Sequence, residues 1–364
     1  MINLIIETLQ YAEDDLKSVQ KVAKTYPIVS TKFPDGTSQA WQLPEDAIED
    51  LSDAYCVTID WRFKEERELF DLVSLWALLT TEFKPHFSKP RYVIDAETSK
   101  HLIFTDHSVP FPIYLNVPYF PFARQDKEIS NISTFNLKVF FEMFNAMLRF
   151  PVVPKHICNI YKPPTITAIR AFDPHSNAIR ELFLQRFEAF RDFKPISPES
   201  KFSPESSHTF EEFVNYMTKW DMIIYPDESA ERRYSKSKVG REEAIPELTI
   251  VKTRDYMTGE ITGSTFSHES IENALTYFEK FDKNVLVIDD ICDGGATFIK
   301  CAALIKEANP NLKRLGLRVS HGIFSKGLKP LKDAGYTDIF YTDSLDPSFD
   351  KEIPEGLNVV KFKL

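Results

Sequence analysis

The feature that most restricts the fold is the segment 285–297, VLVIDDICDGGAT. Its four aliphatic residues predict a buried strand, and the acids Asp289 and Asp290 are expected at the carboxyl end of that strand. The next four residues, DGGA, predict a tight loop, and Thr297 is expected to open a helix. A strand, a glycine loop and a helix in this order are typical of α/β folds, which bind ligands at the carboxyl ends of their strands.

The chemistry of this segment suits a phosphorylated ribose. Carboxylates accept hydrogen bonds from a sugar diol, and glycines let the backbone come close to a phosphate. Free amides at a helix N-terminus attract the phosphate charge, and Thr297 adds a hydroxyl donor. An ordinary strand, an Asp-Gly turn and a capped helix are the less favoured interpretation, because two adjacent acids precede a Gly-Gly-x-Thr loop.

Apolar strands and amphipathic helices alternate along the chain, which predicts an α/β fold with mainly parallel sheets. Phe33 and Asp35 belong to a predicted turn, 33–36, between extended segments, and the Ser- and Pro-rich segment 194–209 predicts a surface loop. Strands are predicted at 2–6, 113–117, 165–171, 222–225, 244–252 and 315–320, and helices at 65–80, 134–148 and 297–307.

Size and composition restrict the class of protein. A chain of 364 residues is long enough for two domains. The 54 acidic and 44 basic residues give a formal charge of −10, which argues against a nucleic-acid partner held by bulk electrostatics. We expect no membrane span and no signal peptide, and the four scattered cysteines suit free thiols in a reducing cytoplasm.

The segment 285–297 resembles the ribose-phosphate-binding signature shared by type I phosphoribosyltransferases and phosphoribosyl-diphosphate synthases, the ribose-phosphate diphosphokinases. Further segments resemble the synthases: PYFPFARQDK (118–127), ITAIRAFDPHS (166–176), IIYPDESAERR (223–233), VKTRDYMTGEITG (251–263), SHGIFS (320–325) and YTDSL (341–345). Each alone could be a turn or a solvated surface, but their unchanged order favours the synthase branch. Nucleobase transferases lack the RQD segment and the long N-terminal half.

The resemblance implies an α/β protein with two phosphoribosyltransferase-like domains, each a mainly parallel sheet flanked by helices. They would span 1–165, on the ATP side with the subunit contacts, and 166–345, with a tail at 346–364 that returns to the first domain. The implied reaction is Mg²⁺-dependent: the diphosphoryl group of ATP passes to the anomeric hydroxyl of ribose 5-phosphate, giving phosphoribosyl diphosphate and AMP. A homo-oligomer is also implied, because in the family a neighbouring subunit's Phe-x-Asp segment closes over the adenine.

The resemblance implies a role for each matching residue. Catalysis would fall to Lys252 and Arg254, on a flexible loop. ATP would be bound by Phe33, Asp35, Arg124, Gln125 and His175, and magnesium would be held near His175 and Asp227. The ribose hydroxyls would be held by Asp289 and Asp290, and the 5-phosphate by Asp293, Gly294, Gly295, Ala296 and Thr297.

The sequence also departs from the family pattern. Gly294 stands where synthases have threonine, and Ala296 stands where they usually have glycine. Ser229 and Ala230 replace a Gly-Gly pair, which changes the approach of the backbone there. After RQDK, EISNIST (128–134) replaces a basic effector loop, so control by phosphate and ADP is not expected.

These departures leave the acceptor open. A phosphate loop with fewer side-chain donors is compatible with ADP-ribose, the acceptor of some phage-encoded relatives in NAD⁺ reconstitution, and the product would be ADP-ribose 1-pyrophosphate. Ribose 5-phosphate remains the first choice because it is the commoner chemistry. A non-catalytic regulatory homologue is a further alternative, against which the retained Lys252, Arg254, His175 and Asp227 argue.

Overall fold

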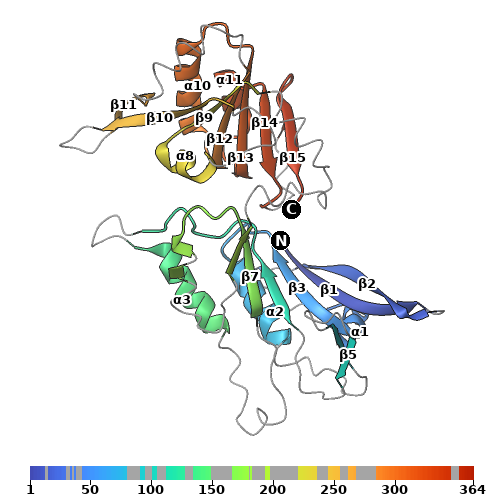
Figure 1. The fold of residues 1–364 in the computed structure, drawn as a ribbon. Helices are drawn as coiled ribbons and strands as arrows, with labels where there is room; N and C mark the ends of the chain where they lie inside the picture. Colours follow the sequence, from blue (N-terminus) through green and yellow to red (C-terminus); the bar gives the residue numbers. More distant parts are fainter. Residues whose placement is uncertain are drawn as a thin grey trace. The chain divides into compact units, whose positions relative to one another are not determined.

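The chain divides into two compact units, Met1–Pro195 and Ile196–Leu364, which are described separately (Figure 1). The computed structural model describes residues 1–12, 15–29, 33–34, 37, 43–79, 91–94, 101–104, 112–127, 134–148, 166–179, 181–182, 193–196, 220–235, 245–254, 261–267, 284–345 and 352–364.

The first unit is built on a six-stranded sheet of order β2-β1-β3-β6-β7-β8. Strand β1 pairs antiparallel with both β2 and β3, whereas β3, β6 and β7 pair in parallel. A separate antiparallel pair is formed by β4 and β5. The bounds are β1 (Ile2–Ala12), β2 (Asp15–Ile28), β3 (Ala54–Trp61), β4 (Arg91–Ile94), β5 (His101–Phe104), β6 (Ile113–Asn116), β7 (Ile166–Phe172) and β8 (Phe193–Ile196).

Three helices contribute to the core of the first unit: α1 (Glu45–Ser52), α2 (Glu68–Ala77) and α3 (Asn136–Leu148). Leu75 of α2 and Phe141 of α3 are buried in the same core as Trp61 of β3. Phe120 stacks on Phe141 with ring centroids 5.3 Å apart. The helices predicted at 65–80 and 134–148 are thus confirmed, each starting two or three residues later than expected.

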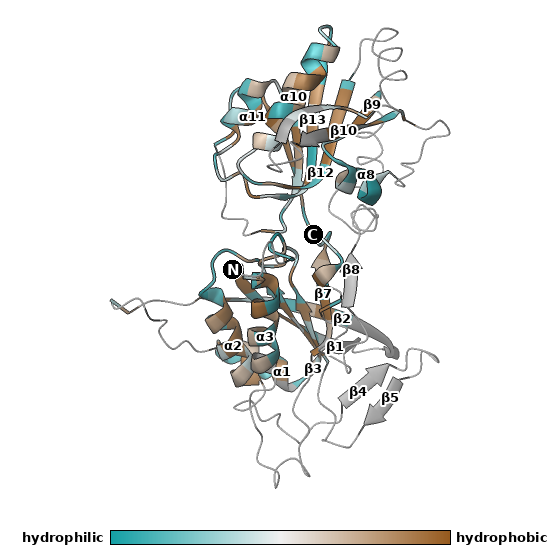
Figure 2. Ribbon diagram, turned by 90° about the vertical axis from the view of Figure 1, so that its left-hand side faces the viewer, coloured by the Kyte–Doolittle hydropathy of each residue, from teal (hydrophilic) through white to brown (hydrophobic). Residues whose placement is uncertain are grey.

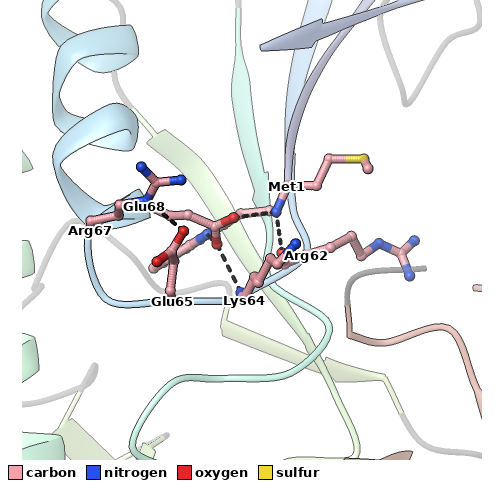
Figure 3. A network of polar contacts seen from close by, with 7 residues as sticks. Met1, Arg62, Lys64, Glu65, Arg67 and Glu68 are labelled. Atoms are coloured by element: carbon pink, nitrogen blue, oxygen red, sulfur yellow. Dashed lines mark hydrogen bonds and ion pairs between the residues drawn. The ribbon is translucent and has the colours of Figure 1, made fainter. Parts of the chain in front are cut away.

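A buried carboxylate ties together the start of β1, the end of β3 and the start of α2 (Figure 3). Glu68 is 8% exposed, and its Oε1 accepts a hydrogen bond from the Met1 amino group at 2.5 Å. Its Oε2 accepts from Trp61 Nε1 at 3.1 Å and from the Lys64 backbone amide at 2.9 Å. Both carboxylate oxygens therefore have donors, which a buried charge requires.

The second unit holds a seven-stranded sheet of order β11-β10-β9-β12-β13-β14-β15. Strands β10 and β11 pair antiparallel, and the other five neighbouring pairs are parallel. The predicted α/β class is confirmed, with two helix-flanked sheets; the second is mainly parallel, whereas the first combines the antiparallel strands β1 and β2 with the parallel strands β3, β6 and β7. The bounds are β9 (Met222–Tyr225), β10 (Glu247–Arg254), β11 (Ile261–Phe266), β12 (Asn284–Cys292), β13 (Arg314–Gly322), β14 (Asp338–Thr342) and β15 (Asn358–Phe362).

Both faces of this second sheet carry buried apolar side chains, and the strands β9 and β13 are largely coloured as hydrophobic in Figure 2. Val285 and Val287 of β12 belong to one core, and Leu286 and Ile288 to another, because alternate side chains of a strand point to opposite faces. The first core includes side chains of α10 (Ala296–Ala308) and α11 (Lys329–Ala334), and the second includes side chains of α8 (Glu228–Tyr234).

Two expectations about domain limits are wrong. The second domain was expected to begin at 166, but β7 pairs with β6 and belongs to the first sheet, so the division falls at 195/196. The tail at 346–364 was expected to return to the first domain, but β15 pairs in parallel with β14 as the edge of the second sheet. An apolar run predicts a strand without saying which sheet it joins.

The described cysteines Cys56, Cys292 and Cys301 are free and buried, as predicted. None of the helices within the described ranges is long and apolar enough to cross a membrane. The segment 194–209 lies outside the described residues except where β8 covers its start.

Candidate functional site

The predicted strand, loop and helix at 285–297 are present in the second unit. Strand β12 lies inside the sheet, between β9 and β13, and continues through both acids to Cys292 rather than ending before them. Gly295 precedes α10 with φ +78°, and a Cβ built there would lie 3.2 Å from Leu331 Cδ2. Glycine is therefore required at 295 by both conformation and space.

The alternation along β12 sends its two acids to opposite faces of the sheet. Asp289 shares the parity of Val285 and Val287, and Asp290 shares that of Leu286 and Ile288. On the α8 face, Asp290 is 4% exposed, and its Oδ2 lies 2.9 Å from Nη1 of Arg233, which comes from α8. Asp290 is thus compensated by a cation of its own unit.

Asp289 is in a different electrostatic position. Its pKa is raised well above the usual range, first by burial and then by the neighbouring charge of Asp290, with a smaller contribution from Asp227. Its Oδ1 accepts a hydrogen bond from the Asp290 backbone amide at 2.8 Å. The excess negative charge around Asp289 favours a proton, a cation or the hydroxyl donors of a ligand.

Asp227 follows β9 and caps α8. Its Oδ1 accepts hydrogen bonds from the backbone amides of Ser229 and Ala230, both at 3.1 Å. The serine and alanine that replace a family Gly-Gly pair therefore form the first turn of a helix, where neither needs a glycine conformation. The contribution of Asp227 to the raised pKa of Asp289 relates these two carboxylates electrostatically.

The turn after β13 lies against the phosphate loop. Cys292 O accepts hydrogen bonds from the amides of Ile323 and Phe324 at 2.9 and 3.0 Å. A Cβ built on Gly294 would lie 3.5 Å from Lys326 Cε and 3.7 Å from Ser325 Oγ. Lys326 was not among the predicted site residues, although the resemblance of SHGIFS had pointed to this turn.

Both Lys252 and Arg254 lie on β10. Lys252 falls within the strand predicted at 244–252, whereas Arg254 was expected on the loop after it and lies on the strand instead. Lys252 pairs with Ser264 and Arg254 with Ile261 of β11, and a bulge separates Thr253 from Arg254. The antiparallel ladder extends the strand beyond the parallel contact with β9, which stops at Thr249. The connecting residues 255–260 lie outside the described part of the chain.

In the first unit, Arg124 and Gln125 follow β6, and His175 follows β7. Arg124 is exposed and His175 is partly exposed. The side-chain oxygen of Gln125 accepts a hydrogen bond from Asn136 at the start of α3. Phe172 donates from its backbone amide to Pro118 O at 3.1 Å, so the two segments leave neighbouring parallel strands at one edge of the sheet.

Phe33 is 48% exposed, and its amide donates to Thr37 O at 2.9 Å, which agrees with the predicted turn. Asp35 lies outside the described residues. The described site residues predicted up to His175 thus belong to the first unit, and those from Asp227 onward belong to the second. Each group is defined within its own unit.

The described residues contain no group of three or more His, Cys, Asp or Glu side chains arranged to hold a metal ion. Magnesium does not need such a cage, because it keeps several waters and binds through one or two carboxylates together with substrate phosphates. Asp227 and the negatively charged surroundings of Asp289 suit a magnesium ion that arrives with a nucleotide.

No protein-family model matches the chain. It is 36% identical over 66 residues to a ribose-phosphate pyrophosphokinase from Mycoplasmopsis pulmonis, covering 18% of this chain and 20% of the relative. It is 22% identical over 247 residues to the enzyme of that name from Thermotoga maritima, covering 67% and 64%. The match to the Pyrococcus abyssi ribose-phosphate pyrophosphokinase is 27% over 136 residues, covering 35% and 47%.

The chain thus spans between 20% and 64% of the length of these curated relatives. Among solved structures, phosphoribosylpyrophosphate synthetase from Mycobacterium smegmatis aligns over 82% of this chain and 92% of its own, with a TM-score of 0.47 and 16% identity.

Proposed function

We propose, from the premise that this chain belongs to the ribose-phosphate pyrophosphokinase family, that it transfers the β,γ-diphosphoryl group of ATP to a ribose phosphate. The acceptor of first choice is ribose 5-phosphate, whose anomeric hydroxyl oxygen attacks the β-phosphorus. The bond from the β-phosphorus to the oxygen that bridges it to the α-phosphorus breaks, and AMP leaves with that oxygen. The products are phosphoribosyl diphosphate, AMP and the proton of the hydroxyl group.

The observation that carries this proposal is the junction of β12 and α10. Free backbone amides of the first helical turn, at Ala296 and Thr297, follow a glycine in the left-handed conformation. Such a turn binds a phosphate through its amides and the helix dipole. Asp289 lies near the carboxyl end of β12 and has a raised pKa. Its carboxyl group can accept hydrogen bonds from the ribose hydroxyls or, when protonated, donate one to them.

The remaining 5-phosphate contacts are assigned to the loop before the helix, Asp293, Gly294 and Gly295. Asp290 would reach the ribose from the other side of β12, but Arg233 already neutralises it. We therefore assign Asp290 mainly to holding Asp289 in place, through the backbone hydrogen bond between them. Asp289 is the acid that meets the sugar.

Lys252 and Arg254 would stabilise charge on the diphosphoryl group in flight. A transfer between polyanions depends on positioning and on fixed cations, so two cations on β10, the strand next to the edge strand β11, are well suited to this role. Phe33, Asp35, Arg124, Gln125 and His175 would bind the nucleotide. Bound Mg²⁺, near His175 and Asp227, would neutralise phosphate charge.

ADP-ribose is a second candidate acceptor because of Gly294. The position has no side-chain hydroxyl for the 5-phosphate, and a Cβ built there would be in ordinary contact with Lys326 and Ser325 at 3.5–3.7 Å. A loop of this kind accommodates a phosphate that carries a further substituent. A homo-oligomer that shares its sites between subunits, and a cytoplasmic location, remain part of the proposal.

The test is AMP release from magnesium–ATP, measured with ribose 5-phosphate and with ADP-ribose. We expect AMP and a sugar 1-diphosphate in stoichiometric amounts with one acceptor, and no AMP without magnesium. AMP with ADP-ribose alone would replace the first acceptor with the second. The absence of AMP with both acceptors would leave the regulatory homologue, and nucleotide binding by calorimetry would then identify that role.

A further inference from the structure

We infer that Lys326 is a further substrate-binding residue of the phosphate loop, residues 293–297, where it binds the phosphoryl group on C5 of the acceptor ribose. The inference rests on the proposed function, because it concerns the same loop. Its chemistry is shared by a phosphate monoester and by the first phosphate of a diphosphate ester. The lysine ammonium group is a compact positive charge that can bind either kind of phosphate.

The first step is the position of the Lys326 side chain. Its Cε and Cδ lie 3.5 and 3.6 Å from the point where a Cβ on Gly294 would stand. The lysine stem thus covers the face of the loop that a larger residue would occupy. The ammonium group, one bond beyond Cε, is within reach of a phosphate seated on the amides of α10.

The second step is that the turn holding Lys326 is fixed. The Gly327 amide donates to Phe324 O at 2.7 Å, which closes a tight turn with Ser325 and Lys326 at its tip. Phe324 is 2% exposed, has φ +46° and packs edge-on to Tyr341 at 5.2 Å. A bulky residue in this strained conformation needs support from its surroundings, and the burial of its ring provides that support.

The third step is charge. Residues 289–297 contain three aspartates and no lysine or arginine. Arg233, the cation recorded against them, is engaged with Asp290. Within the described part of the chain, Lys326 has no ion pair of its own, whereas Lys329 is paired with Asp333 at 2.6 Å. Lys326 is therefore a cation available to a phosphate dianion at this loop.

Lys326 can supply the phosphate donor that Gly294 lacks. Where a threonine would offer a hydroxyl to the phosphate, the glycine offers none, and the lysine stem crosses its open face. A charge-assisted contact is stronger than a neutral hydrogen bond, so the exchange retains affinity for the phosphate. It also moves the donor from the loop itself to the neighbouring turn.

The test compares Lys326→Met with Lys329→Met in the full chain. Lys329 lies three residues further along, is exposed and loses the same charge. We expect Lys326→Met to raise the KM for the acceptor roughly 10- to 100-fold, the range of one charged hydrogen bond, with the KM for ATP unchanged. Lys326→Arg should recover most of the affinity, and Lys329→Met should behave as wild type.

The second readout is acceptor binding without turnover, by calorimetry with magnesium and a non-hydrolysable ATP analogue. Wild type should bind ribose 5-phosphate or ADP-ribose, and Lys326→Met should weaken the binding by the same factor as KM. Equal affinities of wild type and Lys326→Met would overturn the inference and leave the proposed function intact. A wild type that binds and turns over neither acceptor would overturn the proposed function, and the inference with it.

Discussion

Two regions of the second unit carry the predicted chemistry, and they are built differently. The phosphate loop follows β12, which has a parallel partner on each side and buried cores on both faces. Lys252 and Arg254 lie on the far part of β10, beyond its pairing with β9, with the edge strand β11 as their partner. The binding region is thus set by the same contacts that fold the unit, whereas the region with the two cations adjoins the edge of the sheet.

The difference suggests a division of work. A binding loop benefits from a rigid frame because each amide must be in place before the phosphate arrives. Cations that stabilise a transferring group must meet charge that exists only during the reaction, and an edge of lower local stability can adjust to it. Mutations in the loop after β12 should therefore change both stability and ligand binding. Mutations of the two cations on β10 should change turnover alone.

The largest effect is expected for the turnover number when Lys252 of β10 is replaced. Lys252→Ala should lower kcat roughly 100- to 10,000-fold, because a preorganised cation at a developing charge contributes on this scale. The midpoint of thermal unfolding should stay within about 2 °C of wild type, because the substitution leaves the backbone pairing of β10 with β11 in place. AMP release and circular dichroism provide the two measurements, with Lys329→Ala as the control; an unchanged kcat would refute the role of Lys252.

The next largest effect is expected in the first unit. Glu68→Ala removes the acceptor for the Met1 amine, Trp61 Nε1 and the Lys64 amide. Trp61 Nε1 and the Lys64 amide would lose their acceptor, and the Met1 amine would keep only Arg62 O, so the free energy of unfolding should fall by about 2–4 kcal/mol, measured by urea denaturation. Hydrogen exchange should rise in β1, β3 and α2 but not in β12 and β13. An equal rise in both units would show that their stabilities are coupled.

Two glycines with positive φ allow a matched test within the frame of the phosphate loop. Gly295→Ala combines left-handed strain with a 3.2 Å contact to Leu331, whereas Gly327, at φ +72°, has nothing within 4 Å of a built Cβ. We expect a loss of about 2 kcal/mol at Gly295 and about 1 kcal/mol at Gly327, from urea midpoints. Equal losses of stability in the two variants would mean that the Leu331 contact has no effect.

The strand β12, the loop glycines and the helix α10 were predicted well from the sequence because the patterns that indicate them are local. The apolar run at 285–288 and the loop glycines placed β12 and α10, and α10 begins one residue before the predicted start. The long pairing of β1 with β2 was not predicted, because β2 (DLKSVQKVAKTYPI) carries polar residues along most of its length. An edge strand with one exposed face gives a weak apolar signal.

The site was less predictable than the frame. Lys326 has no distinctive sequence signal: a lysine in a turn is usually solvated, and only its contact with Gly294 reveals it. The assignment of β7 to the first sheet depends on a pairing with β6 about fifty residues earlier. Long-range pairings and side-chain contacts of this kind are decided by tertiary packing, which local patterns do not contain.

The smallest effect tests the electrostatics of the frame with two carboxylates of one sheet. Folding raises the pKa of Asp289, mainly by burial, so its stabilising contribution is present below the unfolded pKa and is lost as pH rises through the folded one. For Asp338, burial alone would raise the pKa, but hydrogen bonds from Arg314, Asn358 and Thr337 outweigh it and lower the pKa. Its contribution is present above the unfolded pKa and is lost as pH falls through the folded one.

Asn substitutions should therefore act in opposite directions. Asp289→Asn should be slightly more stable than wild type at pH 8, by less than the loss expected for Gly295→Ala, and the gain should shrink as pH falls. Asp338→Asn should be less stable at pH 8 and approach wild type in acid. Thermal midpoints between pH 4 and pH 8 decide the matter. If Asp289→Asn is destabilised at pH 8, the acid is paired in the fold; if it is stabilised but binds no acceptor, its charge is retained for the ligand at the expense of stability.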